Sequence, residues 1–165
     1  MTRTPTGRIE VVDGEHRLVI VRELRAPIED VWAAVTESER LARWIGTFTG
    51  DPASGLVRFR MTVEEGAPED DMEIRECDPP HRLAVTARSG DEGWRLELDL
   101  VERGGLTVLT FTQPGIAPAS VDSVGPGWEY YLDRLVAAEA GDDPGDLDFG
   151  RDYYPAMADH YRTEA

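Results

Sequence analysis

The sequence contains no lysine and no asparagine, and its single cysteine is Cys77. Without lysine, the chain cannot form a Schiff base, a Walker-type phosphate loop or a Ser–Lys catalytic dyad. Without asparagine, it carries no N-glycosylation site. One cysteine excludes an internal disulfide and a zinc site built from several thiolates. The sequence also lacks an apolar run of about 20 residues, the length that a membrane-spanning helix needs.

Positive charge is scarce in this chain. All 17 basic residues are arginine, and they stand against 33 acidic residues, which gives a formal net charge of -16. Because such a surface repels phosphate backbones and anionic lipids, we expect neither a nucleic-acid nor a membrane partner. No apolar segment follows the first arginines, so no secretory signal is predicted and the expected location is the cytoplasm. A length of 165 residues fits one domain.

Familiar catalytic motifs are also missing. The three histidines, His16, His81 and His160, do not have the spacing of a zinc-binding helix. The sequence contains no G-x-S-x-G nucleophile motif and no dinucleotide-binding glycine motif. The charged residues Glu73 and Arg60 occupy positions of their predicted strands that point away from the inner face of the sheet. We therefore predict no catalytic residue, no cofactor and no metal, and we do not expect an enzyme.

Alternating apolar residues predict an antiparallel sheet. Residues 7–12 and 17–25 flank Asp13-Gly14, a pair typical of a tight hairpin turn. Further alternating runs occupy residues 57–63, 71–77, 82–88, 94–100 and 106–112. Turn residues between these runs recur at short intervals, which indicates a meander of neighbouring strands.

Helical spacing occurs in two places. Ile28, Val31 and Val35 predict a short helix after the first hairpin, and a second short helix carries Leu41 and Trp44. A longer apolar stripe, which includes Trp128, Tyr131, Leu132, Leu135 and Val136, predicts a helix over residues 124–140. The expected fold is α+β, with one curved antiparallel sheet wrapped around this C-terminal helix.

Large side chains fall on the faces predicted to point inward. They either fill the core or line an apolar cavity that holds a small hydrophobic ligand, since ligand pockets are mostly apolar with a few polar anchors. The candidate ligand-binding residues are Trp44, Phe59, Met61, Met72, Trp94, Leu98, Trp128, Tyr131 and Leu135.

Four segments of the chain resemble a known family. They read RAPIEDVW at residues 25–32, ERLARW at residues 39–44, CDPPHRL at residues 77–83 and GWEYYLDRL at residues 127–135. They are similar to segments of the activator-of-heat-shock-protein-90-ATPase-like branch of the START and Bet v-type helix-grip superfamily. The resemblance spans about residues 17–140, and it implies a helix-grip fold with two short helices after the first strands.

The resemblance leaves several functions open, because a fold does not define an activity. The leading hypothesis is a domain that binds an apolar or aromatic small molecule and has no chemistry of its own. The alternative is a co-chaperone-like module that stimulates a chaperone ATPase through its surface. A polyketide cyclase-like enzyme is a third hypothesis.

The C-terminal part of the chain departs from the family pattern. We divide the sequence into a helix-grip domain at residues 1–140 and an acidic linker with a short tail at residues 141–165. Residues 141–150 are predicted to form no packed element, because they are acidic and rich in turn residues. Residues 152–161 carry three tyrosines and a methionine, so we expect them to dock on the domain or on a second subunit of a homodimer.

Overall fold

A computed structural model describes residues 3–89 and 92–164 of the chain. Its eight strands form one antiparallel sheet in the order β1-β2-β8-β7-β6-β5-β4-β3. The strands are β1 (Arg8–Val12), β2 (Glu15–Leu24), β3 (Thr47–Thr49), β4 (Leu56–Arg60), β5 (Glu69–Asp78), β6 (Arg82–Ser89), β7 (Glu92–Arg103) and β8 (Leu106–Pro114). The helices are α1 (Ile28–Thr36), α2 (Ser38–Leu41), α3 (Val121–Glu139), α4 (Phe149–Asp152) and α5 (Ala158–Glu164), with single 3-10 turns η1 (Pro52–Ser54), η2 (Pro118–Ser120) and η3 (Pro144–Asp146).

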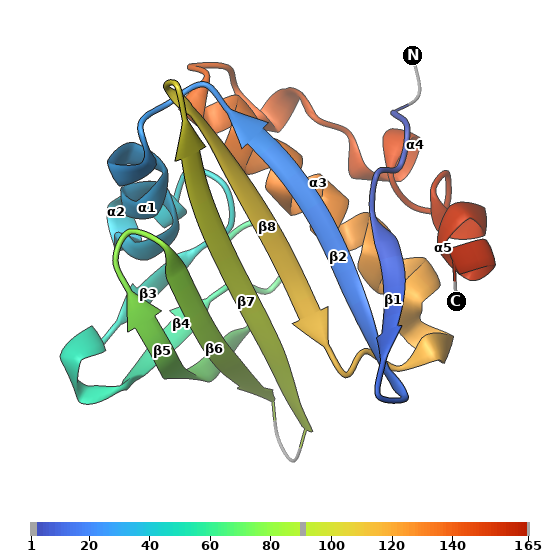
Figure 1. Cartoon of the computed structure of the whole chain (residues 1–165), viewed down its shortest axis with the longest axis horizontal. Helices are drawn as coiled ribbons and strands as arrows, with labels where there is room; N and C mark the ends of the chain where they lie inside the picture. The colour runs from blue at the N-terminus through green and yellow to red at the C-terminus, as the bar shows by residue number, and fades with distance from the viewer. Residues whose placement is uncertain (1–2, 90–91, 165) are drawn as a thin grey trace.

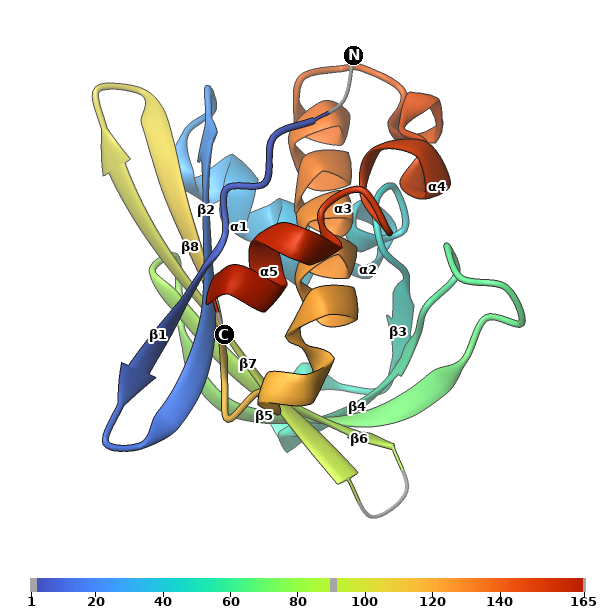
Figure 2. The ribbon, with the colours of Figure 1, turned by 90° about the vertical axis from the view of Figure 1, so that its right-hand side faces the viewer.

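The sheet curves around α3, as the sequence predicts. Figure 1 shows the long strands β2, β8 and β7 crossing in front of α3, and Figure 2 shows β3 and β4 on the far side of the same helix. The inner face of the sheet and the buried stripe of α3 share one core. That core includes Leu18, Ile20, Leu100, Leu109, Leu132 and Leu135, each with almost no exposed surface. The short helices α1 and α2 close one end of the curve.

Local sequence accounts for most of the element boundaries. Asp13 and Gly14 both have positive φ, as a two-residue hairpin turn requires, and Val12 pairs directly with Glu15. Gly104 and Gly105 form the corresponding turn between β7 and β8. At the start of α1, the carbonyl of Pro27 accepts hydrogen bonds from the amides of the first helical turn. Proline suits this position because its missing N–H has no helical partner to lose there.

Some boundaries differ from the prediction. The second short helix ends at Leu41, so Trp44 follows it in a turn, and the strand β3 then begins at Thr47. A Cβ at Gly46 would lie 2.0 Å from the carbonyl oxygen of Arg60, so this stretch runs directly against β4. The long helix begins at Val121, which places Pro126 inside it rather than in its first turn. These differences arise from tertiary contacts that helical spacing alone does not encode.

The C-terminal tail packs on the domain of its own chain. Short helical segments are present between residues 144 and 152, where the sequence predicted no packed element. Helix α5 lies against α3 and β1, and Figure 2 shows it crossing in front of α3. Tyr153 and Tyr161 have 0% exposed surface. The tail therefore covers the part of α3 that the sheet leaves open.

Candidate functional site

A pocket of about 500 Å³ lies between the inner face of the sheet and the helices α1 and α3. Pockets for small molecules usually span about 300–1,000 Å³, so the volume is sufficient for a ligand. Most of its wall is apolar. The sheet contributes Phe59, Met72, Leu83, Leu98 and Phe111, and the helical side contributes Val35, Trp44, Trp128 and Leu132.

Strand pairing explains why these side chains share one face. Residues that pair directly across neighbouring strands point to the same side of a sheet, and successive residues along a strand alternate. Met72 of β5 pairs with Ala87 of β6, and Ala87 pairs with Trp94 of β7. All three residues line the pocket. Leu98 and Phe111, which are paired between β7 and β8, extend the same apolar surface.

Three tryptophans occupy distinct positions in the pocket wall. The indole N–H of Trp44 donates a hydrogen bond to the Ala34 carbonyl at 3.0 Å, which fixes this ring at the helical end. The indole N–H of Trp128 donates to Oε1 of Gln113 at 2.9 Å, and its ring centroid lies 4.6 Å from that of Phe111. Trp94 is 43% exposed, so the pocket opens to solvent beside it.

Few polar groups face the pocket. The hydroxyl of Thr36 donates to the Trp32 carbonyl at 2.7 Å, which satisfies it within α1. Glu64, in the loop before β5, accepts a hydrogen bond from the Tyr131 hydroxyl at 2.8 Å. Burial and this contact raise the pKa of Tyr131, which therefore stays protonated and keeps donating. The remaining charged group on the wall is the carboxylate of Asp70.

The structure brings most of the predicted site residues together. Seven of the nine line the pocket, namely Trp44, Phe59, Met61, Met72, Trp94, Leu98 and Trp128. Tyr131 and Leu135 are not part of its wall. Tyr131 is turned toward Glu64, and Leu135 has 0% exposed surface because α3 is closely packed at that point. Whether the seven residues bind a ligand stays a prediction.

Asp70 and Glu64 line the pocket but are not among the candidate residues of the sequence analysis. The sequence analysis considered the strand parity of Glu73 and Arg60 but not that of Asp70, which lies on the pocket wall. The inward position of Asp70 could have been predicted from the sequence, because Asp70, Met72 and Ile74 occupy alternate positions of one strand and therefore point to the same face. The strand begins at Glu69, whereas the sequence analysis placed its start at Asp71. Asp70 therefore lay outside the predicted strand, and the face to which it points was not considered. Glu64 offered no such signal, since only the fold of its loop brings it to Tyr131.

Two structural observations bear on other classes of site. Within residues 3–89 and 92–164, no three His, Cys, Asp or Glu side chains are grouped in a way that could hold a metal ion. In the same part of the chain, none of the helices combines the length and the apolar character needed to cross a membrane.

Comparison with solved structures supports the same architecture. CalU16 from Micromonospora echinospora matches with a TM-score of 0.71 for its solution structure, at 23% identity, over 96% of this chain and 92% of CalU16. EF2215 from Enterococcus faecalis, described as a conserved protein of unknown function, matches with a TM-score of 0.70 at 22% identity, over 96% of this chain and 89% of that one. DynU16, described as a protein in the dynemicin biosynthetic locus, matches with a TM-score of 0.60 at 22% identity, over 78% of this chain and 49% of its own. At these identities the likeness establishes the fold alone.

The curved sheet, the enclosed long helix and these neighbours define a helix-grip protein, and the predicted fold class is confirmed. The family model described as Activator of Hsp90 ATPase homolog 1-like protein matches residues 25–139. The chain belongs to this family, as the resemblance in its sequence indicated. A search of curated proteins found no match.

Proposed function

We propose that this protein binds a small apolar or aromatic molecule in the pocket between the sheet and α3. The observation that carries the proposal is the pocket itself, which holds about 500 Å³ behind an apolar wall in a domain of ordinary size. Well-packed cores contain few voids larger than a water molecule, so a space of this volume needs an explanation other than imperfect packing. The general capacity of the fold to enclose a ligand supports the same conclusion.

The aromatic wall favours a flat or aromatic ligand. Trp94, Trp128 and Phe111 present ring surfaces to one space, and aromatic rings bind other rings in offset or edge-to-face arrangements. The hydrogen bonds of the Trp44 and Trp128 N–H groups are already satisfied within the protein. Ligand recognition at these positions therefore depends on shape and apolar contact.

The test is to fill the pocket without removing any of its contacts. Ala87→Phe places a ring in the space between Met72 and Trp94, whereas Arg88→Phe places the same ring on the outer face of the same strand. Calorimetric titration with 1-methylnaphthalene, a neutral bicyclic probe, should show binding to the wild type and to Arg88→Phe. Ala87→Phe should lower the affinity about tenfold or more. Absence of binding to the wild type, for this probe and for a panel of apolar metabolites, would contradict the proposal.

A second candidate function follows from the family match, whose description names an activator of the Hsp90 ATPase. In that case the outer surface would act on a chaperone and the pocket would be dispensable. The measurement is the ATPase rate of the cognate chaperone with and without this protein. Stimulation that persists in Ala87→Phe and weakens with salt would favour the surface-mediated function, because the acidic chain would bind through screened charges.

A further inference from the structure

The carboxylates on the two faces of β5 differ in their partners. On the outer face, Glu69 pairs with Arg60 at 2.7 Å and also contacts Arg58, and Asp71 pairs with Arg58 at 3.0 Å. Asp70 lies between these two acids but points to the opposite face, since it pairs directly with the buried Phe59. Within residues 3–89 and 92–164, the carboxylate of Asp70 has no side-chain hydrogen bond and no ion pair.

The surroundings of Asp70 are apolar and carry no compensating positive charge. The pocket wall, as far as the structure describes it, includes no arginine or histidine, and the chain has no lysine. The other charged residue on the wall is Glu64, so the pocket is negative as a whole. Asp70 is half-buried, so its carboxylate remains open to the pocket. A cation bound in the pocket can therefore reach it and form a charge-assisted hydrogen bond.

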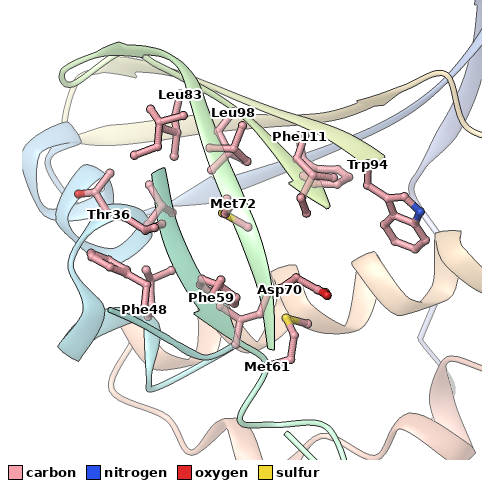
Figure 3. Close-up of a pocket in the computed structure, with 18 of the residues that line it drawn as sticks. Thr36, Phe48, Phe59, Met61, Asp70, Met72, Leu83, Trp94, Leu98 and Phe111 are labelled. Carbon is pink, nitrogen blue, oxygen red and sulfur yellow. The ribbon is translucent and has the colours of Figure 1, made fainter. Parts of the chain in front are cut away.

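The position of Asp70 suits a ligand with one charged end. Figure 3 shows Asp70, Met61 and Trp94 at one end of the pocket, and Thr36 and Leu83 at the other. Because Trp94 is 43% exposed, the charged end of a ligand would stay close to solvent while its apolar body entered the pocket. Trp94 also supplies an aromatic surface at the same end of the pocket (Figure 3), and indole faces attract cations.

Resting on the proposed function, we infer that the pocket selects amphiphilic amines: molecules with an aromatic or apolar body and a protonated amino group that forms an ion pair with Asp70. The same charge distribution rejects ligands with a carboxylate or phosphate, including fatty acids. The ammonium donates hydrogen bonds to the Asp70 oxygens, and the apolar body packs against Met72, Phe111 and Trp128. Asp70 thus determines specificity, whereas the apolar wall supplies most of the contact area.

Three probes with one ring system separate this inference from the proposed function. They are 1-methylnaphthalene, 1-naphthylmethylamine and 1-naphthoic acid, which are neutral, cationic and anionic near neutral pH. Binding is measured by calorimetry at about 0.15 M salt, where non-specific attraction to the acidic surface is screened beyond roughly 8 Å. We expect the amine to bind the wild type about tenfold more tightly than the neutral probe, as one charge-assisted hydrogen bond allows. The acid should bind least.

The variant Asp70→Asn removes the charge and keeps the shape of the side chain. It should lose the roughly tenfold preference for the amine while its affinity for the neutral probe stays within about twofold. The matched control is Asp71→Asn on the outer face of the same strand, which should bind all three probes like the wild type. Circular dichroism and melting temperature establish that both variants fold.

The outcomes are distinguishable. If the neutral probe binds and the amine binds no better, the inference about Asp70 is overturned and the proposed function stands. If Asp71→Asn reduces amine binding as much as Asp70→Asn does, the effect comes from the overall charge and the inference is again overturned. If none of the three probes binds, the inference about Asp70 is overturned, and the proposed function fails as well when the panel of apolar metabolites also shows no binding.

Discussion

The two sides of α3 differ in how completely they are packed. On the side of β1 and β2, the N-terminal segment and the C-terminal tail cover the helix, and Tyr153, Met157 and Tyr161 are almost completely buried. On the side of β4 to β7, the sheet stands away from the helix and leaves the pocket. One helix thus has a sealed side that stabilises the fold and an open side that faces the pocket, where we propose that a ligand binds.

A buried carboxylate holds the sealed side together. Glu129 has 0% exposed surface and accepts hydrogen bonds from the Thr6 amide at 2.8 Å, Arg22 at 2.8 Å and the Tyr161 hydroxyl at 2.7 Å. It therefore joins the N-terminal segment, β2 and the tail to α3. Burial alone would raise the pKa of Glu129, but the hydrogen bonds from Arg22, Thr6 and Tyr161 outweigh burial and lower it.

The comparison of Glu129 with Asp70 shows what distinguishes a structural carboxylate from a candidate binding group. Both acids lie on inward faces. Glu129 is surrounded by donors from three separate segments, whereas Asp70 has none within the described residues. The fully buried charge of Glu129 is tolerated because these partners replace its hydration, whereas Asp70 is only half-buried. Partners are present on the sealed side, and on the open side we propose that the ligand supplies one.

The largest effect should come from removing the tail on the sealed side. A chain truncated after Gly141 loses the burial of Tyr153, Met157 and Tyr161. At about 1.5–3 kcal/mol for each large side chain, the loss is roughly 5 kcal/mol or more, which is comparable to the whole stability of a small domain. Urea denaturation measures the change, and Tyr154→Ala, at a partly exposed neighbouring position, is the control that should change little.

The same truncated chain tests the predicted homodimer. Because the tail packs on its own chain, we expect the oligomeric state, determined from the mass in solution, to stay the same when the tail is removed. A dimer that dissociates on truncation would show that the tail also contacts a second subunit. Unchanged stability would mean that the buried tyrosines contribute nothing, contrary to the prediction.

The next largest effect should come from Glu129→Gln. Loss of this charge removes one of the two acidic partners of Arg22 in the described structure and leaves Asp133, which should cost about 3 kcal/mol at pH 7. Because the pKa of Glu129 is lowered in the folded state, its ionisation stabilises the fold above the unfolded value of about 4.3. This contribution disappears as the pH falls through the lowered pKa. The difference between wild type and variant should therefore shrink below about pH 4, and a difference that stays constant with pH would argue against an ionic role.

A matched pair of glycines in α3 should separate close packing from helix propensity. A Cβ at Gly125 would lie 2.6 Å from the ring of Tyr161, whereas a Cβ at Gly127 meets nothing within 4 Å. Gly125→Ala should destabilise by roughly 1–3 kcal/mol through overpacking. Gly127→Ala should stabilise by up to about 1 kcal/mol, since alanine is the better helix former. Thermal denaturation of both variants gives the comparison, and equal shifts would mean that Tyr161 moves aside freely.

The smallest effect on stability is expected at the mouth of the open side. Trp94 is 43% exposed, so Trp94→Ala should change the free energy of unfolding by less than about 1 kcal/mol. The affinity for 1-methylnaphthalene should nevertheless fall, because the ring forms part of the pocket wall. A variant that loses stability but keeps its affinity would place Trp94 in the core rather than in the site.

Much of the fold could be predicted because its signals are local. Alternation at Trp94, Leu96 and Leu98 gave the strand and its inner face, and the Asp13-Gly14 pair gave the first hairpin. The same alternation of apolar residues predicted most of the candidate residues that line the pocket. The two acidic residues of the pocket wall were not predicted. Asp70 lay just outside the predicted strand, and Glu64 reaches Tyr131 only through the path of its loop.

The sequence by itself determined the periodicities, the turns and the excess of acidic charge, since each depends on residues close together in the chain. Only the tertiary structure decided which inward residues fill the core and which surround an open space. Leu135 and Trp128 lie on one helical stripe, yet the first is sealed and the second lines the pocket. The reason is that packing depends on the distance between α3 and the sheet, which the curvature of eight strands and the docking of the tail set together.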